Sequence, residues 1–273
     1  MSVDYQVTGS IATLTLTEKV YTVALKDALV AAIDRAEADD TVRAIIVTGG
    51  TSVFCAGMDL SPGPATFARR DEPAAARLRD SGGELSLRLY NCNKPLIAAI
   101  NGAAVGVGIT MTLPMDFRIA ADTAKFGFVF AQRGIVLESC SSWFLPRLVG
   151  ISQALDWALS GRVFDAQEAL AGGLVNALYP PEQLMTAAVD LAKRITSATA
   201  PVSVALNRQL LWRMLGESHP MAAHIAESRA MYLRGISPDC AEGVASFLER
   251  RPAKFTETVP HDLPDIFPGR VDP

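Results

Sequence analysis

Residues 53–60 read Val-Phe-Cys-Ala-Gly-Met-Asp-Leu and directly follow an apolar run and a Thr-Gly-Gly turn. The apolar run at 44–47 predicts a buried strand, which the turn at 48–50 delivers into a loop. Ala56 and Gly57 have so little side chain that another molecule can approach the main chain closely. We expect the backbone N–H groups around Met58 to face a ligand oxygen. An ordinary strand-to-helix loop is the alternative interpretation.

A second stretch of small residues, Asn-Gly-Ala-Ala-Val-Gly-Val-Gly-Ile-Thr at 101–110, follows another apolar run at 96–100. It opens a predicted helix, whose first N–H groups are unpaired and carry partial positive charge. Such groups suit a phosphate, a carboxylate or an enolate oxygen. The stretch lacks the third glycine of a dinucleotide fingerprint, and close helix–sheet packing is the alternative. Two such loops after neighbouring strands can supply the two N–H groups of an oxyanion hole.

Around these stretches the chain alternates between strands and helices, and it becomes mainly helical after about residue 150. Strands are predicted at 3–7, 11–16, 43–48, 96–100, 116–121 and 124–128. Helices are predicted at 25–37, at 74–91, after an N-capping aspartate at 165, and at 182–196, 202–215, 221–234 and 238–250. The proline-rich residues 61–73 are expected to form a mobile surface segment or lid. We expect a core over residues 1–200 and a helical region over 201–273.

The composition argues against several classes of protein. The 273 residues are 49% hydrophobic and 20% charged, with a formal net charge of −4, which is typical of a globular protein. This balance does not favour nucleic-acid binding, and no run reaches the roughly 18 apolar residues of a membrane span. The first residues lack a signal-peptide pattern, so a cytoplasmic protein is expected. The four cysteines stand far apart without nearby histidines, so neither a metal site nor disulfides are expected.

Several stretches, taken together and in this order, resemble the enoyl-CoA hydratase/isomerase (crotonase) family. They are residues 54–60, 101–108, Asp-Phe-Arg-Ile-Ala at 116–120, Leu-Pro-Arg-Leu-Val-Gly at 145–150, Ser-Gly-Arg at 160–162 and Glu-Gly at 242–243. The resemblance implies an α/β fold, a spiral of repeated β-β-α units followed by a helical C-terminal region used for trimerisation. It also implies an acyl-CoA substrate, no separate cofactor, and a homotrimer or dimer of trimers.

The resemblance assigns the oxyanion hole to the main-chain N–H groups of Met58 and Val107. These groups hold the thioester oxygen and stabilise the enolate that forms beside it. Many family members have glycine at the second place, so the side chain of Val107 is expected to narrow the acyl pocket. Further substrate contacts are expected at positions in the two loops: Ala56, Asp59, Leu60 and Gly106.

The acid/base group is where this chain departs from the family hydratases. Those enzymes use two glutamates, and the matching positions here are Thr110 and Phe130, which are expected to line the substrate site. Glu138, within Leu-Glu-Ser-Cys-Ser-Ser-Trp at 137–143, resembles the single glutamate of the peroxisomal Δ3,Δ2-enoyl-CoA isomerases. One carboxylate suffices to move a proton from the α to the γ carbon. The alternative is that Glu138 is an N-cap or first-turn acid of the next helix.

The sequence therefore favours an enzyme that converts 3-enoyl-CoA to 2-enoyl-CoA, with Glu138 as acid/base. Three alternatives stay open. The first is a 2-enoyl-CoA hydratase that uses Glu138 and a water held by other groups. The second is another reaction of the family, such as thioester hydrolysis or ring chemistry. The third is a catalytically silent acyl-CoA-binding subunit.

Overall fold

The computed structural model describes residues 2–50, 52–68 and 79–268, whose strands form two sheets. The six-stranded sheet runs in the order β1 (Val3–Thr8), β2 (Ile11–Leu16), β3 (Ala44–Gly49), β5 (Leu96–Ile100), β7 (Phe117–Ala121) and β10 (Ala177–Tyr179). The four-stranded sheet runs in the order β4 (Val53–Cys55), β6 (Ala103–Val105), β8 (Lys125–Gly127) and β9 (Val163–Asp165).

From β3 to β8 the chain builds both sheets at once, because successive strands alternate between them. β1 and β2, the strands predicted at 3–7 and 11–16, form an antiparallel hairpin, and β2, β3, β5, β7 and β10 continue the sheet in parallel. β3, β5 and β7 are each followed by a short strand of the second sheet, namely β4, β6 and β8. Strand β5 is buried at every position, as its continuous apolar run predicts. This alternation gives the spiral of β-β-α units that the resemblance implies.

The helices occupy most of the remaining described residues. They are α1 (Val23–Ala38), α2 (Ser81–Tyr90), α3 (Val107–Thr110), α4 (Ser141–Val149), α5 (Ile151–Ser160), α6 (Ala166–Ala171), α7 (Leu184–Thr196), α8 (Pro201–Met214), α9 (Met221–Gly235) and α10 (Pro238–Glu249). The apolar face predicted for α1 is buried through Leu25, Leu29 and Ile33. Asp165 caps α6 as predicted, because its carboxylate accepts a hydrogen bond from the N–H of Glu168 at 2.9 Å.

The helix predicted at 74–91 is shorter than expected where it can be described. Residues 74–78 lie outside the described residues, and α2 begins only at Ser81. The carboxylate of Asp80 caps it, accepting a hydrogen bond from the N–H of Gly83 at 2.5 Å. Gly82 and Gly83 therefore lie in the first turn of α2. Of the lid predicted at 61–73, residues 63–65 form a short 3₁₀ turn, and residues 69–73 lie outside the described residues.

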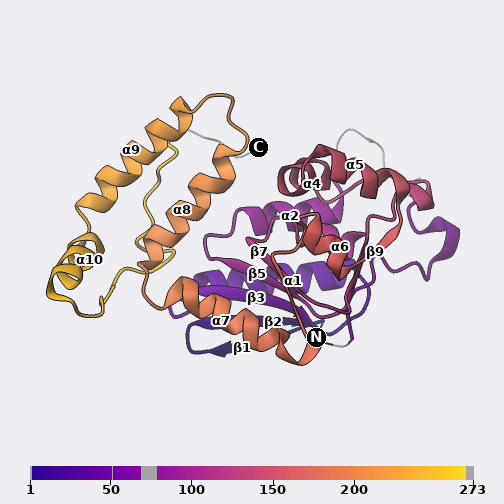
Figure 1. The fold of residues 1–273 in the computed structure, drawn as a ribbon, viewed down its shortest axis with the longest axis horizontal. Helices are drawn as coiled ribbons and strands as arrows, with labels where there is room; N and C mark the ends of the chain where they lie inside the picture. The colour runs from indigo at the N-terminus through magenta and orange to yellow at the C-terminus, as the bar shows by residue number, and fades with distance from the viewer. Residues whose placement is uncertain (1, 51, 69–78, 269–273) are drawn as a thin grey trace.

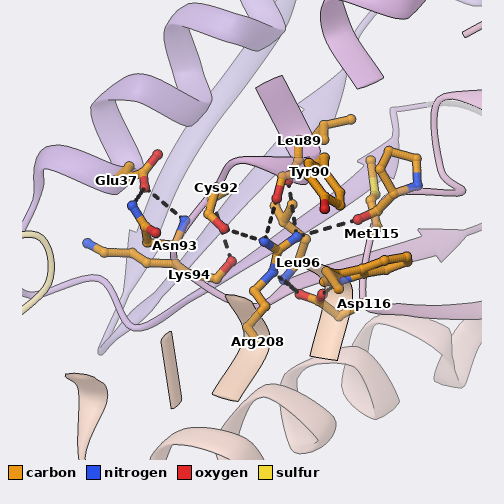
Figure 2. Close-up of polar contacts among 12 residues, drawn as sticks. Glu37, Leu89, Tyr90, Cys92, Asn93, Lys94, Leu96, Met115, Asp116 and Arg208 are labelled. Carbon is orange, nitrogen blue, oxygen red and sulfur yellow. Dashed lines mark hydrogen bonds and ion pairs between the residues drawn. The ribbon is translucent and has the colours of Figure 1, made fainter. Parts of the chain in front are cut away.

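A buried ion pair attaches the C-terminal helices to the core (Figure 2). Arg208 of α8 donates from Nε to the carboxylate of Asp116, just before β7, at 2.9 Å. Its other nitrogens donate to three carbonyls at the end of α2, those of Leu89, Tyr90 and Cys92. The other oxygen of Asp116 accepts a hydrogen bond from the indole of Trp212 at 2.7 Å. Asp116 thus has a structural role, because the Arg208 side chain that it binds connects α8 to the end of α2.

Helices α8, α9 and α10 lie to one side of the sheets (Figure 1). They have a small apolar cluster of their own, made by α8, α9 and the chain after α10. The division of the chain after residue 200 stays a prediction. Over the described residues, the helices are all too short or too polar to cross a membrane.

Candidate active site

Three neighbouring parallel strands of the smaller sheet bring the two glycine loops together. β4 pairs with β6 in the register Val53↔Ala103, and β6 pairs with β8 in the register Ala104↔Phe126. Parallel strands end at the same edge of a sheet, so the chain segments that follow β4, β6 and β8 meet there. This edge is the origin of the candidate site.

The turn of each loop depends on a glycine with positive φ. Gly57 has φ 99° and Gly106 has φ 57°, conformations that residues with side chains rarely adopt. A Cβ at Gly57 would come within 2.9 Å of the carbonyl oxygen of Val105, and a Cβ at Gly106 would lie 3.9 Å from the Cα of Gly57. The two loops are therefore in direct contact. Within the described part of the chain, the N–H groups that follow, those of Met58 and Val107, donate no hydrogen bond.

Backbone hydrogen bonds connect the first loop, residues 56–59, to the segment that precedes α1. The N–H of Tyr21 donates to the carbonyl of Gly57 at 2.8 Å, and the N–H of Asp59 donates to the carbonyl of Tyr21 at 3.1 Å. The N–H of Ala56 donates to the carbonyl of Lys19 at 2.7 Å. The N–H groups on both sides of Met58 are thus used inside the protein, which leaves its own N–H to a ligand.

A cavity of about 140 Å³ lies at these loops and brings together most of the predicted site. The predicted residues that line it are Ala56, Met58, Leu60, Gly106, Val107, Phe130 and Glu138. Asp59 and Thr110 are not among its lining residues. The carboxylate of Asp59 instead accepts hydrogen bonds from the N–H and the hydroxyl group of Ser61, both at 2.9 Å.

Thr110 acts on the cavity through Glu138. Its hydroxyl group donates to one oxygen of the Glu138 carboxylate at 2.5 Å, and the hydroxyl group of Ser139 donates to the other. Burial raises the pKa of Glu138 above its usual range, and these two hydrogen bonds act in the opposite direction. Helix α4 begins later, at Ser141 with Cys140 as its N-cap, so the first-turn interpretation of Glu138 does not hold.

Sequence reasoning missed several residues of this region. The cavity is also lined by Phe67, Val129, Arg133 and Ile135, which no motif identifies. Tyr21, which no motif identifies either, lies near Glu138. Burial raises the pKa of the Tyr21 phenol to about 12; Ser81 lowers this pKa and Glu138 raises it. The Tyr21 hydroxyl is buried, and no described residue reaches it in hydrogen-bond geometry. Of these residues, only Val129 could have been found from the sequence, because it directly follows the strand predicted at 124–128.

Comparisons with known proteins agree with this architecture. A family model described as enoyl-CoA hydratase/isomerase matches residues 7–258. An Alternaria alternata protein named enoyl-CoA hydratase ACTT3 is 43% identical over 224 residues, which are 82% of this chain and 74% of that protein. A probable enoyl-CoA hydratase of Rhodobacter capsulatus is 33% identical over 264 residues, 93% of this chain and 98% of that protein.

A solved structure extends the agreement to three dimensions. The crystal structure of a probable enoyl-CoA hydratase/isomerase from Mycobacterium abscessus matches this chain with a TM-score of 0.83 at 33% identity. The match covers 93% of this chain and 98% of that one. The chain therefore belongs to the enoyl-CoA hydratase/isomerase family and has the crotonase fold.

Proposed function

We propose that this protein is an enoyl-CoA isomerase that converts 3-enoyl-CoA to 2-enoyl-CoA. One observation carries the proposal. Among the described residues that line the cavity, Glu138 has the only carboxylate, and it shares the cavity with Met58 and Val107. A 1,3-proton shift requires one acid/base group and a stabilised enolate oxygen, which are the two features this cavity offers.

In the proposed reaction, the thioester oxygen lies between the N–H groups of Met58 and Val107. Glu138 removes a proton from C2, and the electrons of the C–H bond form the dienolate, whose negative oxygen accepts both hydrogen bonds. The protonated Glu138 then returns the proton to C4, which leaves the double bond between C2 and C3. The carboxylate is regenerated, so the reaction needs no oxidant and no second acid.

The environment of Glu138 suits a base that must also act as an acid. A pKa raised by burial brings the carboxyl group closer to neutral pH, where proton removal and return are both feasible. The hydroxyl groups of Thr110 and Ser139 hold the two oxygens in a fixed orientation. Such fixed donors reduce the reorganisation required when the charge moves.

A 2-enoyl-CoA hydratase is the second candidate, because the named relatives from Alternaria alternata and Rhodobacter capsulatus are called hydratases. Water addition in the family hydratases uses two glutamates, and those positions hold Thr110 and Phe130 here. The hydroxyl group of Thr110 is already bonded to Glu138, and the ring of Phe130 cannot transfer a proton. These two residues favour the isomerase.

The proposal is tested by assaying 3-enoyl-CoA and 2-enoyl-CoA thioesters with the wild type and with Glu138→Gln. Glu182→Gln, at an exposed position on the surface, is the matched control. We expect the wild type and the control to isomerise 3-enoyl-CoA, and Glu138→Gln to lose on the order of 10²–10⁴ in rate. An unchanged rate in Glu138→Gln contradicts the assignment of the base. Conversion of 2-enoyl-CoA to the 3-hydroxy product without isomerisation supports the hydratase.

We also propose that the protein forms a homotrimer or a dimer of trimers, as the resemblance implies. Large apolar side chains are exposed on the C-terminal helices, for example Leu211, Met231 and Phe247, which are 74%, 72% and 82% exposed. Clusters of such side chains typically mark interaction surfaces. Light scattering is expected to give three or six times the chain mass of 29.1 kDa. A monomer at micromolar concentration contradicts the proposal.

A further inference from the structure

The Glu138 carboxylate lies against the first turn of α2. A Cβ added at Gly82 would overlap with one carboxylate oxygen of Glu138 and with the hydroxyl oxygen of Ser139. Gly82 lies in the first turn of α2, where its missing side chain leaves space for the carboxylate of Glu138. An alanine at this position would force the carboxylate of Glu138 and the hydroxyl group of Ser139 to shift.

Asp80 connects the same turn to the chain around Glu138. One oxygen of its carboxylate accepts a hydrogen bond from the N–H of Gly83 in α2 at 2.5 Å and another from the N–H of Ser139 at 3.1 Å. Ser139 and Cys140 have φ values of 56° and 54°, in the left-handed region. That region costs a residue with a side chain roughly 1–2 kcal/mol. The hydrogen bond from Ser139 to Asp80 therefore stabilises a strained segment directly beside Glu138.

We propose that Asp80 is a positioning residue for Glu138, because it ties Ser139 to the start of α2 and so seats the Glu138 carboxylate on Gly82. The inference rests on the proposed function, in which Glu138 is the acid/base group. Asp80 is not among the described residues that line the cavity. Its role goes beyond that of an ordinary helix cap, since Asp165 caps α6 in the same way without any contact to Glu138.

The charge of Asp80 also acts on the base. The groups that act on the pKa of Glu138 are the hydroxyls of Thr110 and Ser139 and the carboxylate of Asp80. The phenol of Tyr21 and the thiol of Cys140 also interact with Glu138, and Arg133 lines the same cavity. The pKa of Tyr21 is raised to about 12, so the phenol is neutral near pH 7. Asp80 is thus the negative charge that raises the pKa of Glu138, in addition to the larger effect of burial. Because Asp80 is exposed, solvent and salt weaken this effect.

Three variants separate the role of the charge from that of the hydrogen bonds. Asp80→Asn keeps an acceptor oxygen and removes the charge, whereas Asp80→Ala removes both. Gly82→Ala places a methyl group in the space that the Glu138 carboxylate occupies. Asp165→Ala is the matched control for the loss of a helix cap. Gly235→Ala is the control for alanine in a helix, since a Cβ there meets nothing within 4 Å. The isomerisation of 3-enoyl-CoA is measured as kcat, KM and a pH profile at low ionic strength, with Glu138→Gln in parallel.

We expect Asp80→Ala and Gly82→Ala to lower kcat on the order of 10–100-fold, as misplacement of a catalytic group does, with little change in KM. The two control variants are expected to keep the wild-type kcat. Asp80→Asn is expected to keep most of kcat, with the acidic limb of its pH profile shifted to lower pH. Wild-type kcat in Asp80→Ala overturns the positioning role of Asp80, and wild-type kcat in Gly82→Ala overturns the role of Gly82 in placing the carboxylate. An unmoved pH profile in Asp80→Asn overturns the effect of the Asp80 charge on Glu138. A wild-type rate in Glu138→Gln instead overturns the proposed function itself, and the positioning role with it.

Discussion

Replacing Gly57 with alanine tests whether the Met58 N–H of the first loop stabilises the negative oxygen of the enolate. Gly57 has φ 99°, and a Cβ there would come within 2.9 Å of the carbonyl oxygen of Val105. The conformation alone costs a residue with a side chain about 1–3 kcal/mol. To relieve the collision, the peptide between Gly57 and Met58 must rotate, which turns the Met58 N–H away from the thioester oxygen. Loss of one oxyanion donor costs about 2.7–4 kcal/mol of transition-state stabilisation, or roughly 10²–10³ in kcat.

The strain and the lost donor are separated by a matched variant at Gly9. This glycine also has a positive φ, 60°, but lies in the turn between β1 and β2, and a Cβ there meets nothing within 4 Å. The assay measures kcat and KM for a 3-enoyl-CoA thioester and thermal unfolding for both variants. Gly9→Ala is expected to lose stability and keep its kcat, whereas Gly57→Ala loses both. Equal kcat in the two variants refutes the oxyanion-hole assignment.

Three further predictions concern the base and the anchor of α8. Because burial raises the pKa of Glu138, its ionised form destabilises the fold as pH rises through the range between its unfolded and folded pKa values. Glu138→Gln is therefore expected to melt at a higher temperature than the wild type at neutral pH; a lower midpoint contradicts the raised pKa. Thr110→Val removes a hydrogen bond that lowers this pKa, so the acidic limb of kcat/KM should move to higher pH, and an unmoved limb counts against the contact. Arg208→Ala leaves the carboxylate of Asp116 buried without its cation, which should lower the free energy of unfolding by about 3–5 kcal/mol in urea titrations. The control Arg251→Ala breaks an exposed ion pair and should change stability little; equal losses in the two variants argue against the buried anchor.

The parts of the structure that follow from local pattern could be predicted from the sequence. Alternation at residues 11–16 and the apolar run at 96–100 gave β2 and β5, and the periodicity from residue 25 gave α1. The glycines at 57 and 106 marked the two loops because a positive φ leaves a signal in the residue type. The two loops come together because β4 pairs with β6. The family resemblance implied this pairing, whereas the periodicity of the sequence did not predict it.

The environment of Glu138 could not be read from local pattern, since its contacts come from distant parts of the chain. Thr110 was predicted as a substrate contact and instead bonds to Glu138, because α3 places its hydroxyl group beside that carboxylate. Asp80 and Gly82 act through the first turn of α2, whose start was predicted too early. The substrate contact expected of Asp59 stays a prediction, and its carboxylate is bonded to Ser61. Side-chain roles of this kind depend on long-range packing, which a single sequence does not encode locally.

In the proposed reaction one carboxylate, Glu138, carries a proton from C2 to C4 of an enolate held by backbone N–H groups. It is tested most directly by single-turnover conversion of 3-enoyl-CoA labelled with deuterium at C2, with the product examined by NMR and mass spectrometry. With the wild type we expect 2-enoyl-CoA that carries part of the label at C4, and with Glu138→Gln we expect no turnover on the same timescale. Formation of a 3-hydroxyacyl-CoA product, or equal transfer of label by Glu138→Gln, would contradict it.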